Sequence, residues 1–349
     1  MKVGIITIFA VPNYGAMLQA HGLSSHLRRS GLDAELVNYR QPALEEYYRF
    51  KFRFPPAVNH WRRLRNGGRF VENTLRIGTQ PVGSAGQFQT HVGDYDAFIA
   101  GSDQIWFTGA VQFYDPMFFL DFPAPGKRKI SYAASAGGNE TFGKFEDQVR
   151  NAVNDIDHLG VRDAHTASLV APLTEKPLTQ TVDPVLLHDF DDLLSEKRPS
   201  KEPYMLVFGD FRGDLAQVVR EVKKVTGLKK VVSLQYPCPE ATVREASPGP
   251  VEWLNWFRHA DFVVTSYFHG AVVATKFKRP FISVPTPGRR HKVATLLEPL
   301  GLRRRCFMDP RELNTLGDVA GEVIDWATVE AQLEPRINAS KMFLHKALS

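Results

Sequence analysis

The chain has 349 residues, of which 43% are hydrophobic and 23% are charged, so about two domains with sizeable cores are expected. Its two cysteines, Cys238 and Cys306, exclude a disulfide framework and a Cys-x-x-Cys metal site, which favours a reducing cytoplasm. The excess of 43 Lys and Arg over 38 Asp and Glu favours anionic partners. We expect no signal peptide, and no apolar run approaches the roughly 18 residues of a membrane span.

The first element is the continuous apolar run 2–8, which predicts a buried strand, and a helix is expected from about residue 16 to 30. The loop between them carries the turn formers Pro12, Asn13 and Gly15 and no carboxylate. This pattern is typical of a βα unit whose helix N-terminus faces a ligand. No G-x-G-x-x-G follows the strand, so the loop is not a dinucleotide-binding fingerprint.

The segment from Arg49 to Arg76, within an insertion at about 45–80, alternates basic and aromatic residues around the single acid Glu72. Its basic and large apolar members are Arg49, Lys51, Arg53, Arg62, Arg63, Arg65, Arg69, Arg76, Phe50, Phe52, Phe54, Trp61, Leu64 and Phe70. This composition suits the inner face of a membrane or a lipid-linked phosphate, and also a solvated surface insertion whose aromatic residues pack locally. No nucleic-acid-binding module accompanies it, so nucleic acid is not expected as a partner.

Two further apolar runs, 96–100 and 129–134, end in polar or small residues. The first continues into Ser102, Asp103 and Gln104, and the second into Ser135 and two glycines. Polar side chains at the carboxyl end of a parallel strand are well placed for a ligand. The alternative is that Asp103 caps a helix and Ser102 is a turn residue.

Apolar runs at 156–161 and 180–183 place Arg162, Asp163 and Asp183 at further strand ends. Together with the run 34–39, the alternation of strands and helices predicts an α/β fold with a doubly wound parallel sheet at 1–190. A polar stretch with prolines at 189–203 precedes a second Rossmann-like domain at 203–324, with strands expected at 204–208, 230–234, 261–265 and 280–284. We expect the two domains to face each other across a cleft, and the helical tail 325–349 to cross back to the first domain.

The second domain carries Tyr267-Phe268-His269-Gly270, where a strand is expected to end and a helix to begin. A histidine in this turn lies beside the backbone N–H groups of the helix, where α/β proteins bind anions, and it can move a proton near neutral pH. The alternative is a histidine that only caps an ordinary turn. The basic residues that follow the strand 280–284 are either anion ligands or solvent-exposed; they are Arg289, Arg290, His291 and Lys292.

Six segments resemble the polysaccharide pyruvyl transferase family, in the family's order. They are Asn13-Tyr14-Gly15-Ala16-Met17-Leu18-Gln19, Gly101-Ser102-Asp103-Gln104-Ile105-Trp106, Ser131-Tyr132-Ala133-Ala134-Ser135, Val161-Arg162-Asp163, Val182-Asp183-Pro184 and Ser266-Tyr267-Phe268-His269-Gly270. The resemblance implies transfer of a pyruvyl group from phosphoenolpyruvate to sugar hydroxyls of a cell-surface polysaccharide or its lipid-linked precursor, on a scaffold similar to the B-type glycosyltransferases. Some members carry an arginine two residues before the histidine, where this chain has Tyr267, so the cation for the donor must come from elsewhere or the donor differs.

For this chemistry, His269 is expected to protonate the methylene carbon of the donor while a sugar hydroxyl attacks the neighbouring carbon. Arg162, which the resemblance also marks, would hold the donor's carboxylate or phosphate, and Asp103 would accept the hydroxyl proton, with Asp183 and Asp210 as the next candidates. Donor binding is assigned to Arg162, Phe268, His269, Gly270, Arg289, Arg290, Lys292 and Ser135. Acceptor binding is assigned to Asn13, Tyr14, Gly15, Ser102, Asp103 and Gln104. Neither step requires a metal or another cofactor.

Two functions of other classes remain open. A nucleotide-sugar-dependent glycosyltransferase on the same scaffold would bind a nucleoside diphosphate in place of phosphoenolpyruvate. A non-catalytic glycan- or membrane-binding protein would keep its role after His269 and Arg162 are replaced by alanine. Each reading fits a cytoplasmic protein, with or without peripheral contact with the membrane.

Overall fold

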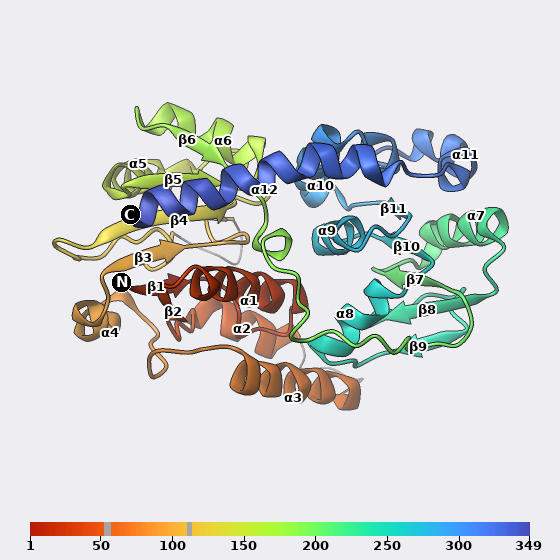
Figure 1. Ribbon diagram of the computed structural model, residues 1–349, viewed down its shortest axis with the longest axis horizontal. Coiled ribbons are helices and arrows are strands. Elements are labelled where there is room, and N and C mark those ends of the chain that lie inside the picture. Colours follow the sequence, from red (N-terminus) through yellow and green to blue (C-terminus); the bar gives the residue numbers. More distant parts are fainter. Residues whose placement is uncertain (52–56, 110–113) are drawn as a thin grey trace. The chain divides into compact units, whose positions relative to one another are not determined.

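The computed structural model describes residues 1–51, 57–109 and 114–349 (Figure 1). The contacts within the chain divide it into two compact units, each with its own parallel sheet. Unit 1 consists of Met1–Val58, Gly67–Asp189 and Pro335–Ser349, and unit 2 of Asn59–Asn66 and Phe190–Glu334. Phe52, Arg53 and Phe54 of the basic aromatic segment lie outside the described residues.

Unit 1 contains a six-stranded sheet in the order β2-β1-β3-β4-β5-β6, and all of its strand pairs are parallel. The strands are β1 (Lys2–Ile6), β2 (Asp33–Leu36), β3 (Ala97–Ala100), β4 (Arg128–Ala134), β5 (His158–Val161) and β6 (Leu178–Gln180). The order runs outward in both directions from the neighbouring strands β1 and β3, which confirms the predicted doubly wound sheet. In such sheets the carboxyl ends of the strands around this reversal form the usual ligand-binding edge.

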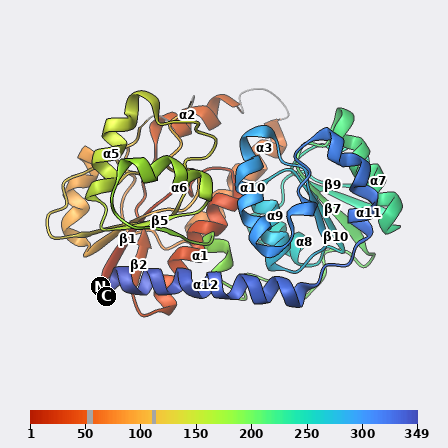
Figure 2. The ribbon, with the colours of Figure 1, turned by 90° about the horizontal axis from the view of Figure 1, so that it is seen from above.

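Helices cover both faces of this sheet, because its strands are apolar on both sides. α1 (Tyr14–Arg29) and the later part of α12 (Trp326–Leu348) lie on one face, and α5 (Glu146–Asp155) and α6 (Ala164–Val170) on the other (Figure 2). Phe343 of α12 packs 6.4 Å from the ring of Tyr132 in β4. Gly160 in β5 makes room for it, since a Cβ there would lie 2.9 Å from the Phe343 ring. Between β2 and β3 the chain forms α2 (Pro42–Lys51), α3 (Ala57–Thr74) and α4 (Ala85–Phe88).

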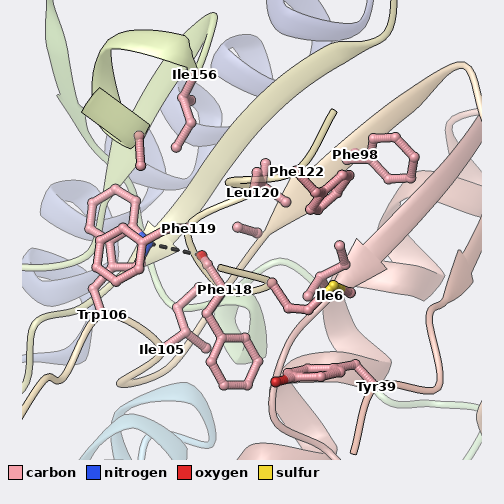
Figure 3. Close-up of a cluster of buried hydrophobic side chains, with 14 of the residues drawn as sticks. Ile6, Tyr39, Phe98, Ile105, Trp106, Phe118, Phe119, Leu120, Phe122 and Ile156 are labelled. Carbon is pink, nitrogen blue, oxygen red and sulfur yellow. Dashed lines mark hydrogen bonds between the residues drawn. The ribbon is translucent and has the colours of Figure 1, made fainter. Parts of the chain in front are cut away.

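The core of unit 1 is rich in aromatic side chains (Figure 3). Trp106 is fully buried and stacks on Phe119, with ring centroids 5.4 Å apart and 7° between the planes. Its indole N–H donates to the carbonyl of Phe118 at 3.0 Å, which satisfies the one polar group of the buried indole. Phe98 and Phe122 add an edge-to-face pair at 5.3 Å. This core anchors the segment that follows β3 and carries the candidate site residues Ser102 and Asp103.

Unit 2 contains a five-stranded parallel sheet in the order β11-β10-β7-β8-β9. The strands are β7 (Tyr204–Phe208), β8 (Lys230–Leu234), β9 (Val243–Glu245), β10 (Phe262–Thr265) and β11 (Phe281–Ser283). α7 (Ala216–Thr226) and α11 (Leu316–Gly321) cover one face, and α8 (Pro250–Arg258) and α9 (Phe268–Lys276) the other (Figure 2). α10 (Arg290–Leu297) follows β11.

Most of the expected strands are confirmed. The predictions 204–208 and 230–234 match β7 and β8, and α12 covers the tail that was expected to be helical. β9 was not expected, because Val243–Glu245 holds one apolar and two charged residues and lies at the edge of the sheet.

His26, near the end of α1, makes part of the stability depend on pH. The pKa of His26 is lowered from 6.5 to about 4, mainly by burial and in smaller part by the nearby Lys341, His188 and Arg29. As the pH falls, the unfolded chain therefore binds a proton at His26 before the folded chain does. The contribution of His26 to the free energy of unfolding is fully present above about pH 6.5 and is lost as the pH falls toward 4. We expect His26→Gln to reduce the fall in melting temperature over this window, and identical pH profiles for the two proteins would contradict this prediction.

Candidate functional site

The residues expected to carry chemistry follow the carboxyl ends of strands in both units. Because the strands of each sheet are parallel, these ends meet at one edge of each sheet. Unit 1 brings together the loops after β1, β3, β4, β5 and β6, and unit 2 those after β7, β8, β10 and β11.

In unit 1, the guanidinium of Arg162 lies between two carboxylates. Its Nη1 is 3.0 Å from Oδ2 of Asp183 and 3.5 Å from Oδ1 of Asp103. The side chains of Arg162 and Asp183 are 3% and 1% exposed, whereas that of Asp103 is 12% exposed. Burial alone would lower the pKa of Arg162, but Asp103, Asp183 and Asp163 outweigh it and raise this pKa above its usual value. Three predicted site residues thus form one charged cluster, of which Asp103 is the most accessible member.

These contacts bear on the predicted roles of the cluster. Arg162 holds two carboxylates of its own unit, and its contact with a donor stays a prediction. Asp103 has a φ of 75° and bridges to Ala134, so the alternative that it caps a helix is wrong. Asp183 accepts a hydrogen bond from the backbone N–H of Val185 at 3.0 Å, which confirms its role in the turn alongside its ion pair.

Two serines predicted to meet ligands are instead internal. Ser102 and Ser135 are both 0% exposed. The Ser102 hydroxyl donates to the carbonyl of Ala133 at 2.7 Å, and the Ser135 hydroxyl donates to Asp163 at 2.7 Å. Hydroxyls with internal partners and no exposed surface hold the ends of β3 and β4 in place. Both hydroxyls therefore have structural roles, and the acceptor contact of Ser102 and the donor contact of Ser135 stay predictions.

The other residues predicted to bind the acceptor differ in how much of their surface is exposed to solvent. Asn13 is exposed and caps α1 through a hydrogen bond from the Ala16 N–H to its side chain at 3.4 Å. Tyr14 and Gly15 are buried in the first turn of α1. Gln104 is half-buried, which leaves Asn13, Asp103 and Gln104 as the residues of this set with accessible surface.

In unit 2, His269 lies in the first turn of α9, directly after β10. The helix has Tyr267 as its N-cap residue, and its first backbone hydrogen bond runs from Ala271 to the carbonyl of Tyr267. The N–H groups and the dipole at a helix N-terminus attract anions. His269 is 9% exposed and packs edge-to-face on Phe268 at 5.4 Å. The turn therefore combines an ionisable imidazole with a helix end suited to a phosphate or a carboxylate.

Gly270 lets α9 lie against β10. A Cβ at this position would be 2.1 Å from Oγ1 of Thr265, which donates to the carbonyl of Phe208 at 2.9 Å. We expect Gly270→Ala to lower the free energy of unfolding by about 1–3 kcal/mol, because the turn must shift. Gly68 in α3 has no atom within 4 Å of its Cβ position, so Gly68→Ala should be neutral or stabilising by about 0.5–1 kcal/mol. Urea unfolding compares the two variants, and equal effects would contradict the steric explanation.

An aromatic group that the sequence analysis missed stands beside His269. Phe208, Tyr236 and Tyr267 follow or end β7, β8 and β10, and we call them the aromatic shelf. Tyr267 stacks on Tyr236 with centroids 5.1 Å apart and lies 5.0 Å from Phe208. The guanidinium carbon of Arg289 lies 4.4 Å from the centroid of the Tyr267 ring. The sequence signal for this group was only that each aromatic residue stands at or just after the end of an apolar run.

The remaining predicted cations and carboxylates have different surroundings. Lys292 is 4% exposed, with its Nζ 6.0 Å from the centroid of Phe268, so the solvent-exposed alternative is wrong for this residue. Arg289 and Arg290 are half-buried. Asp210 forms a surface ion pair with Arg212, whose hydrogen bonds lower the pKa of Asp210.

The described part of the basic aromatic segment lies mainly on α2 and α3 (Figure 1). Phe70 is 5% exposed and packs against the ring of His21 at 6.1 Å, so local packing is confirmed for this aromatic residue. Trp61 is 67% exposed, with Arg62 and Arg65 exposed beside it. Among residues 1–51, 57–109 and 114–349, no helix has the length and apolar character required to cross a membrane.

The fold is similar to that of enzymes that handle nucleotide sugars. Arabidopsis thaliana UGT89C1, solved with UDP-L-rhamnose, has 12% identity and a TM-score of 0.56, with coverage of 100% of this chain and 98% of that chain. The UDP-GlcNAc 2-epimerase from Methanocaldococcus jannaschii has 9% identity and a TM-score of 0.56, with coverage of 96% and 99%. A putative UDP-N-acetylglucosamine 2-epimerase from Listeria monocytogenes has 12% identity and a TM-score of 0.54, with coverage of 95% and 94%. At these identities the likeness shows the fold alone, and it agrees with the predicted scaffold of two Rossmann-like units similar to the B-type glycosyltransferases.

Comparison with curated proteins finds no match. The family model for polysaccharide pyruvyl transferase matches residues 13–287. This range runs from Asn13, which caps α1, to the loop after β11, and it contains the Arg162 cluster of unit 1 and the His269 turn of unit 2. The chain therefore belongs to the polysaccharide pyruvyl transferase family.

Proposed function

We propose that this protein transfers the pyruvyl group of phosphoenolpyruvate to hydroxyls of a saccharide, forming a pyruvate ketal and releasing phosphate. The observation that carries the proposal is the position of His269 in the first turn of α9, with Arg289 held by Tyr267, the N-cap residue of the same helix. Phosphoenolpyruvate carries a phosphate and a carboxylate, so its site needs a helix N-terminus and fixed cations. Unit 2 offers both at one edge of its sheet.

The reaction needs a proton on carbon as well as anion binding. In the proposed first step, His269 gives its proton to the methylene carbon, and an acceptor hydroxyl attacks the neighbouring carbon as it loses its own proton to a base. Departure of phosphate and attack by a second hydroxyl then close the ketal, with loss of that hydroxyl's proton. The cations on unit 2 would stabilise the charge on the departing phosphate.

We assign the base to Asp103. Its side chain is 12% exposed, which makes it the most exposed carboxylate of the cluster in unit 1, and Oδ1 lies 3.5 Å from Nη1 of Arg162. Asp183 is 1% exposed and holds both Arg162 and the backbone of Val185, so it is better suited to positioning Arg162.

The direct test is phosphate release from phosphoenolpyruvate in the presence of a panel of free and lipid-linked saccharides, with products identified by mass spectrometry. The expected result is phosphate release that depends on one class of saccharide and yields an acid-labile pyruvate ketal. Phosphate release without a saccharide, or sugar transfer from a nucleotide sugar in the same panel, would contradict the proposal.

A nucleotide-sugar-dependent glycosyltransferase is the second candidate, and the aromatic shelf is the observation that favours it. Half-buried tyrosine rings such as Tyr236 and Tyr267 form a surface of the kind on which nucleobases stack. This candidate predicts that UDP or GDP binds to the protein and that phosphoenolpyruvate does not.

We further propose a lipid-linked acceptor at the inner face of the membrane. The exposed indole of Trp61 and the adjacent guanidinium groups of Arg62 and Arg65 on α3 have the chemistry of an interfacial anchor for anionic headgroups. The saccharide panel tests this, because lipid-linked saccharides in vesicles should then be better acceptors than the same saccharides in solution.

A further inference from the structure

We infer that Arg289, held on the ring of Tyr267, is the anion-binding cation at this edge of unit 2, and that the aromatic shelf positions it. Tyr267 lies two residues before His269 and does not itself supply a cation there. The guanidinium carbon of Arg289 lies 4.4 Å from the centroid of the Tyr267 ring. A cation from the loop after β11 thus reaches the turn after β10. The inference rests on the proposed function, because the anion is taken to be the donor's phosphate or carboxylate.

The orientation of the Tyr267 ring is set by its neighbours on the shelf. Tyr236 stacks on it at 5.1 Å with 25° between the planes, and Phe208 lies at 5.0 Å with 38°. Phe208 is itself fixed edge-to-face against Trp253 at 5.1 Å. Side chains from the ends of β7 and β8, backed by Trp253 of α8, therefore fix the ring on which Arg289 rests.

Arg289 is held without being neutralised. Its Nη1 donates to Oγ1 of Thr286 at 3.0 Å, and within the described part of the chain no carboxylate lies within ion-pair distance of it. Arg303 and Arg304 in the same unit differ, because each pairs with a glutamate. A planar guanidinium that is oriented by an aromatic ring and keeps most of its donors available is suited to bidentate binding of phosphate or carboxylate.

The shelf thereby gives Tyr267 a positioning role. The cation–π contact orients Arg289 before the ligand arrives, so less side-chain entropy is lost on binding. The phenol hydroxyl is not required for this contact, because the ring face attracts the cation. Phenylalanine at position 267 should therefore preserve the function of the shelf, and leucine should not.

The experiment is calorimetric titration with phosphoenolpyruvate, and in parallel with UDP, of the full chain and of Tyr267→Phe, Tyr267→Leu, Arg289→Ala and the Tyr267→Leu/Arg289→Ala pair. We expect Tyr267→Phe to bind phosphoenolpyruvate as the unmodified protein does, Tyr267→Leu to bind about 3- to 30-fold more weakly, and Arg289→Ala about 10- to 100-fold more weakly. The double variant should be no weaker than Arg289→Ala alone, since Tyr267 acts through Arg289. Circular dichroism verifies that each variant is folded.

Two outcomes separate this inference from the proposed function. Unchanged affinity in Tyr267→Leu, or losses that simply add in the double variant, would overturn the positioning role while leaving pyruvyl transfer intact. Binding of UDP alone, with the same pattern of losses across the variants, would support Arg289 and Tyr267 as the anion-binding pair and overturn phosphoenolpyruvate as the donor. Binding of neither ligand would overturn both.

Discussion

Replacing His269 by glutamine should reduce acceptor-dependent phosphate release by about 10²- to 10⁴-fold, because the amide cannot deliver a proton to the methylene carbon. Glutamine keeps a polar side chain of similar length in the first turn of α9, where His269 is 9% exposed. We therefore expect the melting temperature to change little while kcat falls. The measurement is steady-state phosphate release at saturating phosphoenolpyruvate, together with thermal unfolding of the same preparation.

His259 provides the matched control for this prediction. It belongs to the same unit but precedes β10, whereas His269 follows that strand, and its ring bonds to the carbonyl of Ser195 at 2.9 Å. We expect His259→Gln to retain nearly full activity. A His269→Gln protein that keeps a tenth or more of the original rate would contradict the assignment of His269 as the acid.

The second large effect is expected on stability. Arg162→Met leaves Asp183 and Asp103 buried without their shared cation, and removing one partner of a buried ion pair typically costs about 3–5 kcal/mol. We expect the free energy of unfolding in urea to fall by about this amount. Asp183→Asn in the Arg162→Met background should recover part of the lost free energy of unfolding, because it removes one of the two buried carboxylate charges that no longer have a cation.

An exposed ion pair of the same length gives the control. Arg29 and Asp189 also lie 3.0 Å apart, but their side chains are 52% and 53% exposed. Because solvent screens such a pair, Arg29→Met should cost about 1 kcal/mol or less. Equal losses for Arg162→Met and Arg29→Met would mean that the charges of the Arg162 cluster are not buried in solution as they are in the structure.

The two sheets could be predicted from the sequence because their strands are buried on both faces. Runs such as Tyr204–Phe208 are apolar without interruption, which distinguishes them from the amphipathic helices between them. The short edge strand Val243–Glu245 could not be found this way, because half of its surroundings are solvent and its composition is that of a loop.

The site could be predicted only in part. The sequence shows which residues follow the end of a strand, but it does not show which other residues their side chains contact. The positions of Arg162 and Asp103 after their strands were predicted, and their contact with each other was not. The inward direction of Ser102 depends on the turn in which it lies and on the carbonyl of Ala133, which is remote in sequence. The aromatic shelf likewise joins side chains from three strands, a relation that no local pattern records.

Calorimetric titration of the unmodified protein with phosphoenolpyruvate, and separately with UDP and GDP, tests the central claim most directly. The account predicts saturable binding of phosphoenolpyruvate and none of either nucleotide. Saturable binding of UDP or GDP, with no heat from phosphoenolpyruvate, would contradict the claim and favour a nucleotide-sugar-dependent glycosyltransferase.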